Sequence, residues 1–216
     1  GSALQTLAQT MPAVGIGVAV GASAATVAAL IALLTTLSRR WPAGVLALGA
    51  AGYLASGPVL GVGLVAFWNR YDWRGAVYDH PAIMVLGVAA QLLPFAVLAL
   101  AVARRAQPET WEDAAAANGL PPGRAWARIT LPALLPALAA VWSLGFVLSS
   151  RSLDVLLLTE PPGYTPLAVR LFSLMHYGPR ADVAVLALAH AAIGLSGGLF
   201  GFFAWRTLRR RFVGTA

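Results

Sequence analysis

The sequence predicts an all-α integral membrane protein in which five transmembrane helices form a bundle. Two observations predict this fold class. First, 59% of the 216 residues are apolar, only 11% are charged and the mean hydropathy is +0.75, whereas a soluble domain carries about 25% charged residues. Second, the charges are separated by long uncharged runs that lack the alternation of membrane β-strands. Helices are expected because each one satisfies its own backbone hydrogen bonds in lipid.

Five uncharged runs supply the predicted spans. The helices are expected over roughly residues 12–37, 43–68, 81–103, 133–150 and 183–205. The other gaps between charges do not exceed ten residues, which is too short for a helix to cross a hydrocarbon core of ~30 Å. The whole chain, 1–216, is therefore predicted to be a single transmembrane domain with a loop at 104–132 on one side and a segment at 151–182 on the other.

The arginines predict the orientation in the membrane, since all fifteen basic residues are arginine and ten fall on the side of the 104–132 loop. Those ten are Arg39, Arg40, Arg104, Arg105, Arg124, Arg128, Arg206, Arg209, Arg210 and Arg211, and the other five are Arg70, Arg74, Arg151, Arg170 and Arg180. Basic loops stay in the cytoplasm. We therefore expect the N-terminus outside the cell, the C-terminus in the cytoplasm and the segment 151–182 outside.

The cytoplasmic loop carries its own helix signals. Pro108 suits a first helical turn, and acidic residues follow it where the helix dipole favours negative charge. The alanines at 114–117 favour helix, Asn118-Gly119 predicts a left-handed C-cap, and the prolines at 121–122 can start a second short helix. A two-helix loop is therefore predicted, with an alanine face suited to a groove on another protein.

This loop resembles the EAA loop of binding-protein-dependent ABC importer permeases. The matching residues are Asp113, Ala114, Ala115, Gly119, Ile129, Leu131 and Pro132. Asp113 stands where glutamate is usual in the family, and a register based on Glu112 would break the spacing to Gly119. The resemblance implies a type I permease core in the bacterial cytoplasmic (inner) membrane, with these seven residues as the ATPase-coupling site.

The resemblance also implies partners for the chain. They are ABC ATPase subunits, a second permease copy or half, and an external solute-binding protein, with the lipid bilayer as surroundings. The chain has no glycine-rich phosphate loop and no lysine, so it is predicted not to be the ATPase itself. As a transport subunit it is expected not to be an enzyme. We expect no cofactor in this chain, ATP and Mg being held by the partner ATPase, and no nucleic-acid partner despite the net charge of +7.

The external segment resembles permeases for ferric iron, with thiamine and phosphonate importers close behind. The resemblance rests on the stretches 161–164, 167–170 and 175–178, and it makes ferric iron the expected solute. Asp154, Arg170, His176 and, within the last span, His190 are candidates for the solute pathway or for contact with the binding protein. Two other interpretations stay open: solvated residues at the rim, and a neutral His190 bonded to a neighbouring helix.

Two other function classes fit the composition less well. An ion-gradient-driven secondary transporter or channel bundle usually has carboxylates at mid-membrane, and none of the five runs contains Asp or Glu. An intramembrane serine enzyme would use Ser196, but His190 lies about 240° away around the same helix. There is no cysteine, and the three histidines do not have metal-ligand spacing, so no metal site is predicted.

Overall fold

The computed structural model describes residues 2–37 and 56–212, and all of its regular secondary structure within these ranges is helical. The long helices are α1 (Ser2–Thr35), α5 (Ala82–Arg105), α8 (Leu131–Ser149) and α11 (Arg180–Phe212). The shorter elements are α3 (Gly57–Trp68), α4 (Trp73–Tyr78), α6 (Thr110–Ala117), α7 (Pro122–Ala125), the π-helical turn η1 (Trp126–Thr130), α9 (Leu153–Thr159) and α10 (Leu167–Tyr177). The all-α fold class is confirmed.

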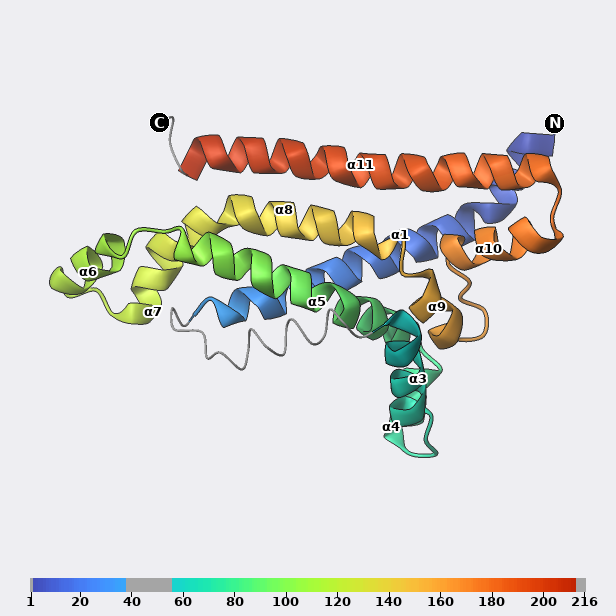
Figure 1. The fold of residues 1–216 in the computed structure, drawn as a ribbon, viewed down its shortest axis with the longest axis horizontal. Coiled ribbons are helices and arrows are strands. Elements are labelled where there is room, and N and C mark those ends of the chain that lie inside the picture. The colour runs from blue at the N-terminus through green and yellow to red at the C-terminus, as the bar shows by residue number, and fades with distance from the viewer. Residues whose placement is uncertain (1, 38–55, 213–216) are drawn as a thin grey trace.

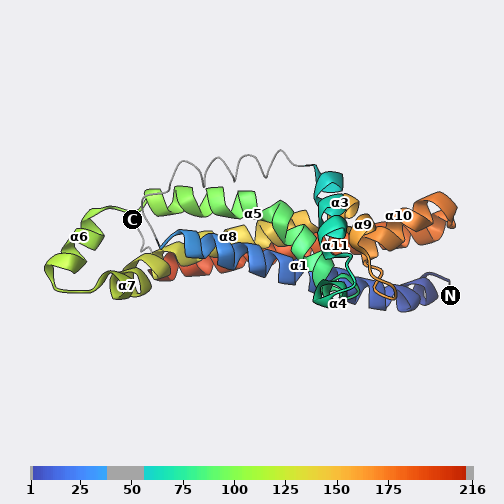
Figure 2. The same ribbon diagram turned by 90° about the horizontal axis from the view of Figure 1, so that it is seen from below.

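The four long helices run along the long axis of the molecule, with α6 and α7 at one end, α9 and α10 towards the other, and α3 and α4 projecting to one side in Figure 1 (Figures 1 and 2). The α6–α7 loop lies at one end, together with the C-terminal ends of α5 and α11, whose last turns carry Arg104, Arg105 and Arg209–Arg211. The start of α1 lies at the opposite end, beside α10. The basic helix ends and the two-helix loop therefore share one end of the bundle.

Four helices in the described ranges are long and apolar enough to cross a membrane. They cover Thr10–Thr35, Ala82–Arg105, Pro122–Ser149 and Arg180–Arg211, and they correspond to the first, third, fourth and fifth predicted spans, with ends that differ by up to eleven residues. The second predicted span, 43–68, is described only from residue 56, where α3 supplies twelve helical residues; residues 43–55 lie outside the described ranges. Pro58 stands in the first turn of α3, where a missing N–H costs nothing.

The fourth span starts earlier than its apolar run at 133–150 predicts. Helix α7 continues through η1 into α8 without a break, so the second half of the loop is the first part of the span. Pro132 is the second residue of α8, one position after the residue that follows the π-helical turn. A proline ring clashes with the carbonyl four residues earlier, and local π geometry relieves this clash. The charges at Arg124 and Arg128 lie on this helical extension.

The core lies where α1, α5 and α8 meet. Ala24, Ala28 and Ala32 recur every four residues on α1 and share one buried cluster with α5 side chains such as Leu92 and Leu100. More than half of the apolar window of α5 is buried, against 11% for α11, so α5 is central and α11 peripheral. Close contact between α8 and α11 requires small residues: a Cβ at Gly197 would overlap Phe146 and one at Gly201 would overlap Ser143.

Candidate functional site

The left-handed glycine predicted for the 104–132 loop is present. Gly119 has φ +72°. Its N–H donates to the carbonyl of Ala116 at 2.9 Å, and the N–H of Leu120 donates to the carbonyl of Ala115 at 2.9 Å. These two bonds, with Asn118 as C-cap, form a Schellman motif, which satisfies the last carbonyls of a helix. The motif ends α6 and turns the chain towards Pro121 and α7.

Helix α6 presents a smooth outer face. Asp113 and the alanines at 114, 116 and 117 are exposed, while Ala115 is buried. Glu112 and Asp113 lie in its first turn, where negative charge is favoured by the helix dipole. The exposed alanines present little side-chain bulk to a partner surface.

An open groove of about 660 Å³ separates α6 from the start of α8. It is lined by Trp111, Ala114, Ala115, Asn118, Arg128, Ile129, Pro132, Ala133 and Arg211. Of the predicted coupling residues, the structure therefore brings together Ala114, Ala115, Ile129 and Pro132. Asp113, Gly119 and Leu131 are outside its lining. The two arginines and Trp111 give this groove a cationic and aromatic character that the motif alone did not indicate.

A buried polar cluster lies behind the loop, and sequence reasoning missed it. Arg104, near the end of α5, is 2% exposed. Its guanidinium bonds to the Glu112 carboxylate, to Gln107 Oε1 at 3.3 Å and to the carbonyl of Thr36 at 3.4 Å. Thr130 completes the cluster: its hydroxyl donates to Glu112 Oε1 at 3.2 Å, and its carbonyl accepts from Gln107 Nε2 at 3.3 Å.

The cluster left only a weak signal in the sequence. In the sequence Arg104 is one of ten arginines that indicate orientation, and Glu112 lies one position before the register that fits the spacing of the motif. On one continuous helix an arginine and a glutamate eight positions apart would lie about 12 Å apart along the axis, too far for an ion pair, so only the turn between α5 and α6 brings them together. Neighbouring Glu112 and Asp113 point about 100° apart on α6, and accordingly Glu112 turns inward while Asp113 is exposed.

The solute-pathway candidates are dispersed. Asp154, in the first turn of α9, accepts from Gln91 Nε2 at 3.5 Å and lies so close to Gly57 that a Cβ there would overlap its carboxylate. His176 is exposed on α10 and its ring lies against Phe172. Across the described ranges, no hydrogen bond or ion pair connects any two of Asp154, Arg170, His176 and His190.

His190 has a partner on a neighbouring helix, which was one of the two interpretations left open. Its Nε2 lies 3.2 Å from the carbonyl of Ser150, the C-cap of α8. The hydroxyl of Ser196 donates to the carbonyl of Ile193 at 2.7 Å on its own helix. The two side chains are therefore engaged separately, and the arrangement does not form a serine–histidine pair.

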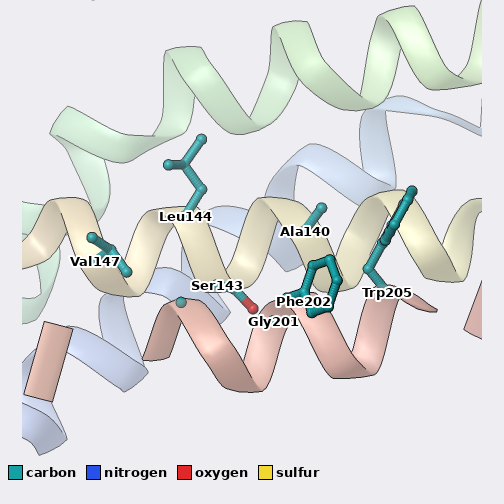
Figure 3. Close-up of a pocket in the computed structure, with 8 residues that line it drawn as sticks. Ala140, Ser143, Leu144, Val147, Gly201, Phe202 and Trp205 are labelled. Atoms are coloured by element: carbon teal, nitrogen blue, oxygen red, sulfur yellow. The ribbon is translucent and has the colours of Figure 1, made fainter. Parts of the chain in front are cut away.

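A second groove, of about 460 Å³, lies between α8 and α11 (Figure 3). Its lining includes Leu144, Val147, Phe202 and Trp205, and its one hydroxyl, on Ser143, donates to the carbonyl of Ala139. The lining is otherwise largely apolar, which suits acyl chains or another apolar helix better than a polar solute.

Comparison with known proteins gives relatives among transport permeases, while no family model matches. The chain is 34% identical over 100 residues to the putrescine transport system permease protein PotI of Escherichia coli (strain K12), covering 46% of this chain and 34% of that protein. It is 36% identical over 84 residues to the putative 2-aminoethylphosphonate transport system permease protein PhnV of Salmonella typhimurium, covering 39% of this chain and 32% of PhnV. The chain spans about a third of the length of these relatives.

These relatives confirm the predicted resemblance to binding-protein-dependent ABC permeases. Both relatives are named as permease proteins of transport systems, which agrees with the long apolar helices of this chain. Ferric iron as the solute is not supported, since the two relatives are named for an amine and for an aminophosphonate.

Proposed function

We propose that this chain is the transmembrane permease subunit of an ATP-driven ABC importer. The observation that carries the proposal is the exposed helix, left-handed glycine and second helix formed by α6, Gly119 and α7 at one end of the bundle. This geometry belongs to the residues that resemble the EAA loop. The similarity to transport permeases supports the same conclusion.

In this proposal α6 docks into a groove on a cytoplasmic ATPase. Its alanine face allows close approach, and Asp113 is exposed for a charged or hydrogen-bonding contact with the ATPase. Because α7, η1 and α8 are continuous, a displacement of the loop is passed directly to a membrane helix. Nucleotide binding and hydrolysis then belong to the partner.

The remaining partners are also proposals. A second copy, or a related permease half, would complete the pathway, and an external binding protein would deliver solute near α10, where His176 and Tyr177 are exposed. The loop and the end of α11 would face the cytoplasm, since that end carries the basic helix termini. Cysteines introduced at Asn118 and at Tyr177 test this orientation, because only the latter should react with an impermeant reagent in intact cells.

We infer a small organic amine as the solute. Putrescine and 2-aminoethylphosphonate, the compounds for which the relatives are named, share a primary amino group on a short alkyl chain. An ammonium group is therefore a chemical feature that the two named solutes share. Ferric iron remains in the test as a comparison.

The experiment is uptake into proteoliposomes that contain the permease, its ATPase and its binding protein. Labelled putrescine, 2-aminoethylphosphonate and ferric iron are offered with ATP inside, and again with a hydrolysis-deficient ATPase. ATP-dependent uptake of an amine supports the proposal. Uptake that persists without hydrolysis and stops when an ionophore collapses the ion gradient would favour a secondary transporter instead.

A further inference from the structure

We propose that the buried cluster of Arg104, Glu112 and Thr130 is the internal joint that carries movement of α6 to the transmembrane helices. The inference rests on the proposed function and assigns a positioning role inside the chain, distinct from the exposed residues that would meet the ATPase. It names Glu112, the acidic residue next to Asp113, as the residue that holds the loop to the membrane domain.

The first argument is how little else attaches α6 to the bundle. Of its eight residues only Ala115 is buried. The helix is followed by Gly119 and the prolines at 121 and 122, and it is preceded by Pro108. Apolar packing therefore contributes little to its attachment, and the Glu112 carboxylate supplies a direct polar link from α6 to α5 and to η1.

The second argument is the number of elements that meet at one guanidinium. Arg104 belongs to α5, and it bonds to Glu112 on α6 and to the carbonyl of Thr36 just beyond the end of α1. Gln107, which also bonds to Arg104, donates to the carbonyl of Thr130 in η1. A planar guanidinium donates in several fixed directions at once, so this one side chain holds together the ends of α1 and α5 and the first turn of α6, while Gln107 connects the group to η1.

The third argument concerns Glu112 Oε1. This single oxygen accepts from Arg104 and from the hydroxyl of Thr130, so it joins α6 both to the end of α5 and to the π-helical turn that leads into α8. Isolated π-helical turns in α-helices often mark functional sites. A movement of α6 therefore acts on α5 and on the start of α8 together, and Thr36 extends the connection to α1.

The first test uses variants that break the joint while leaving the outer face of α6 intact. Thr130→Val removes the hydroxyl at nearly constant volume, and Thr130→Ser keeps it as the matched control. Arg104→Met combined with Glu112→Leu removes both charges together, because removing one alone would leave the other buried and unpaired. Asp113→Asn serves as the comparison, since it changes only the exposed contact.

Two quantities are measured for each variant in proteoliposomes: the affinity of the ATPase for the permease, and the solute transported per ATP hydrolysed. We expect Thr130→Val and the double variant to keep wild-type affinity but to transport at least about five-fold less solute per ATP, the lower end of typical coupling energies. Thr130→Ser should behave as wild type. Asp113→Asn should lower the affinity and leave the solute transported per ATP by the assembled complexes unchanged.

A spectroscopic readout separates coupling from mere folding. The chain contains no cysteine, so single spin labels can be placed at Ala117 on α6 and at Leu144 on α8. With ATP both labels should move in the wild type, and only the α6 label should move in the double variant. Wild-type transport per ATP in both Thr130→Val and the double variant would overturn the proposal that this cluster is the internal joint. Failure of the wild-type chain to bind an ATPase would instead overturn the proposed function.

Discussion

Replacement of Gly119 by valine should uncouple the loop from transport, and the structure allows the cost to be worked out. A Cβ built at this position meets no atom within 4 Å, so the penalty is conformational and not steric. With φ at +72°, an L-residue pays about 1–2 kcal/mol, and a β-branched one lies at the upper end. That energy corresponds to a factor of about 5–30 in the population of the native turn.

The loop is sensitive to such a change because α6 has eight residues. Isolated helices shorter than about 12–15 residues are marginal in water, so α6 depends on its cap and on its few contacts. A graded series is therefore expected: Gly119→Asn close to wild type, Gly119→Ala intermediate and Gly119→Val most impaired. Asparagine ranks first because it tolerates the left-handed region best among the three.

The assay is ATP-driven uptake together with ATPase co-purification, at matched membrane abundance. Gly123 provides the matched control, since it lies four residues later, also has open space around it and has no positive φ. Gly123→Ala should behave as wild type, because alanine is favoured over glycine within a helix. Equal transport by Gly119→Val and by Gly123→Ala would refute the argument that the left-handed turn shapes the coupling loop.

Three further predictions follow from particular contacts. Asp113→Glu should retain transport and Asp113→Lys should lose ATPase co-purification, since lysine reverses the charge near the start of α6; equal binding by both would contradict this. Gly57→Ala should lower the melting temperature through about 1–3 kcal/mol of overpacking against Asp154, and an added Asp154→Ala should restore part of it in a double-mutant cycle. Hydrogen bonds from Arg74 hold the pKa of Asp72 below its usual range. The Asp72 carboxylate should therefore stabilise α4 fully above the ordinary carboxylate pKa, and this stabilisation should be lost as the pH falls through the lowered pKa. Protection of the α4 amides from hydrogen exchange should show the same pH dependence, and Asp72→Asn should abolish that dependence.

The sequence alone determined those features whose causes are local. The length of each uncharged run decides whether a helix can span the bilayer, and this depends only on composition along the chain. The turn at Asn118 and Gly119 was equally predictable, because all hydrogen bonds of a Schellman motif lie within six consecutive residues. The resemblance carried by Asp113, Ala114 and Ala115 depended on spacing, which is also a property of the chain itself.

Only the tertiary structure decided which residues meet. The arginine count predicts on which side of the membrane Arg104 lies. Its burial and its contacts with Glu112 and Thr36 arise because the ends of α1 and α5 and the start of α6 lie next to one another. The continuity of α7 with α8 was not predictable locally, because the charge of Arg124 and the ring of Pro132 both favour a helix boundary before residue 133. In the structure the π-helical turn η1 connects the two helices without a break. Likewise Asp154 and His190 were candidates by residue type, and packing gave them separate partners in Gln91 and Ser150. Side chains far apart in sequence are brought into contact by helix packing, and that information resides in the fit between helices rather than in any one of them.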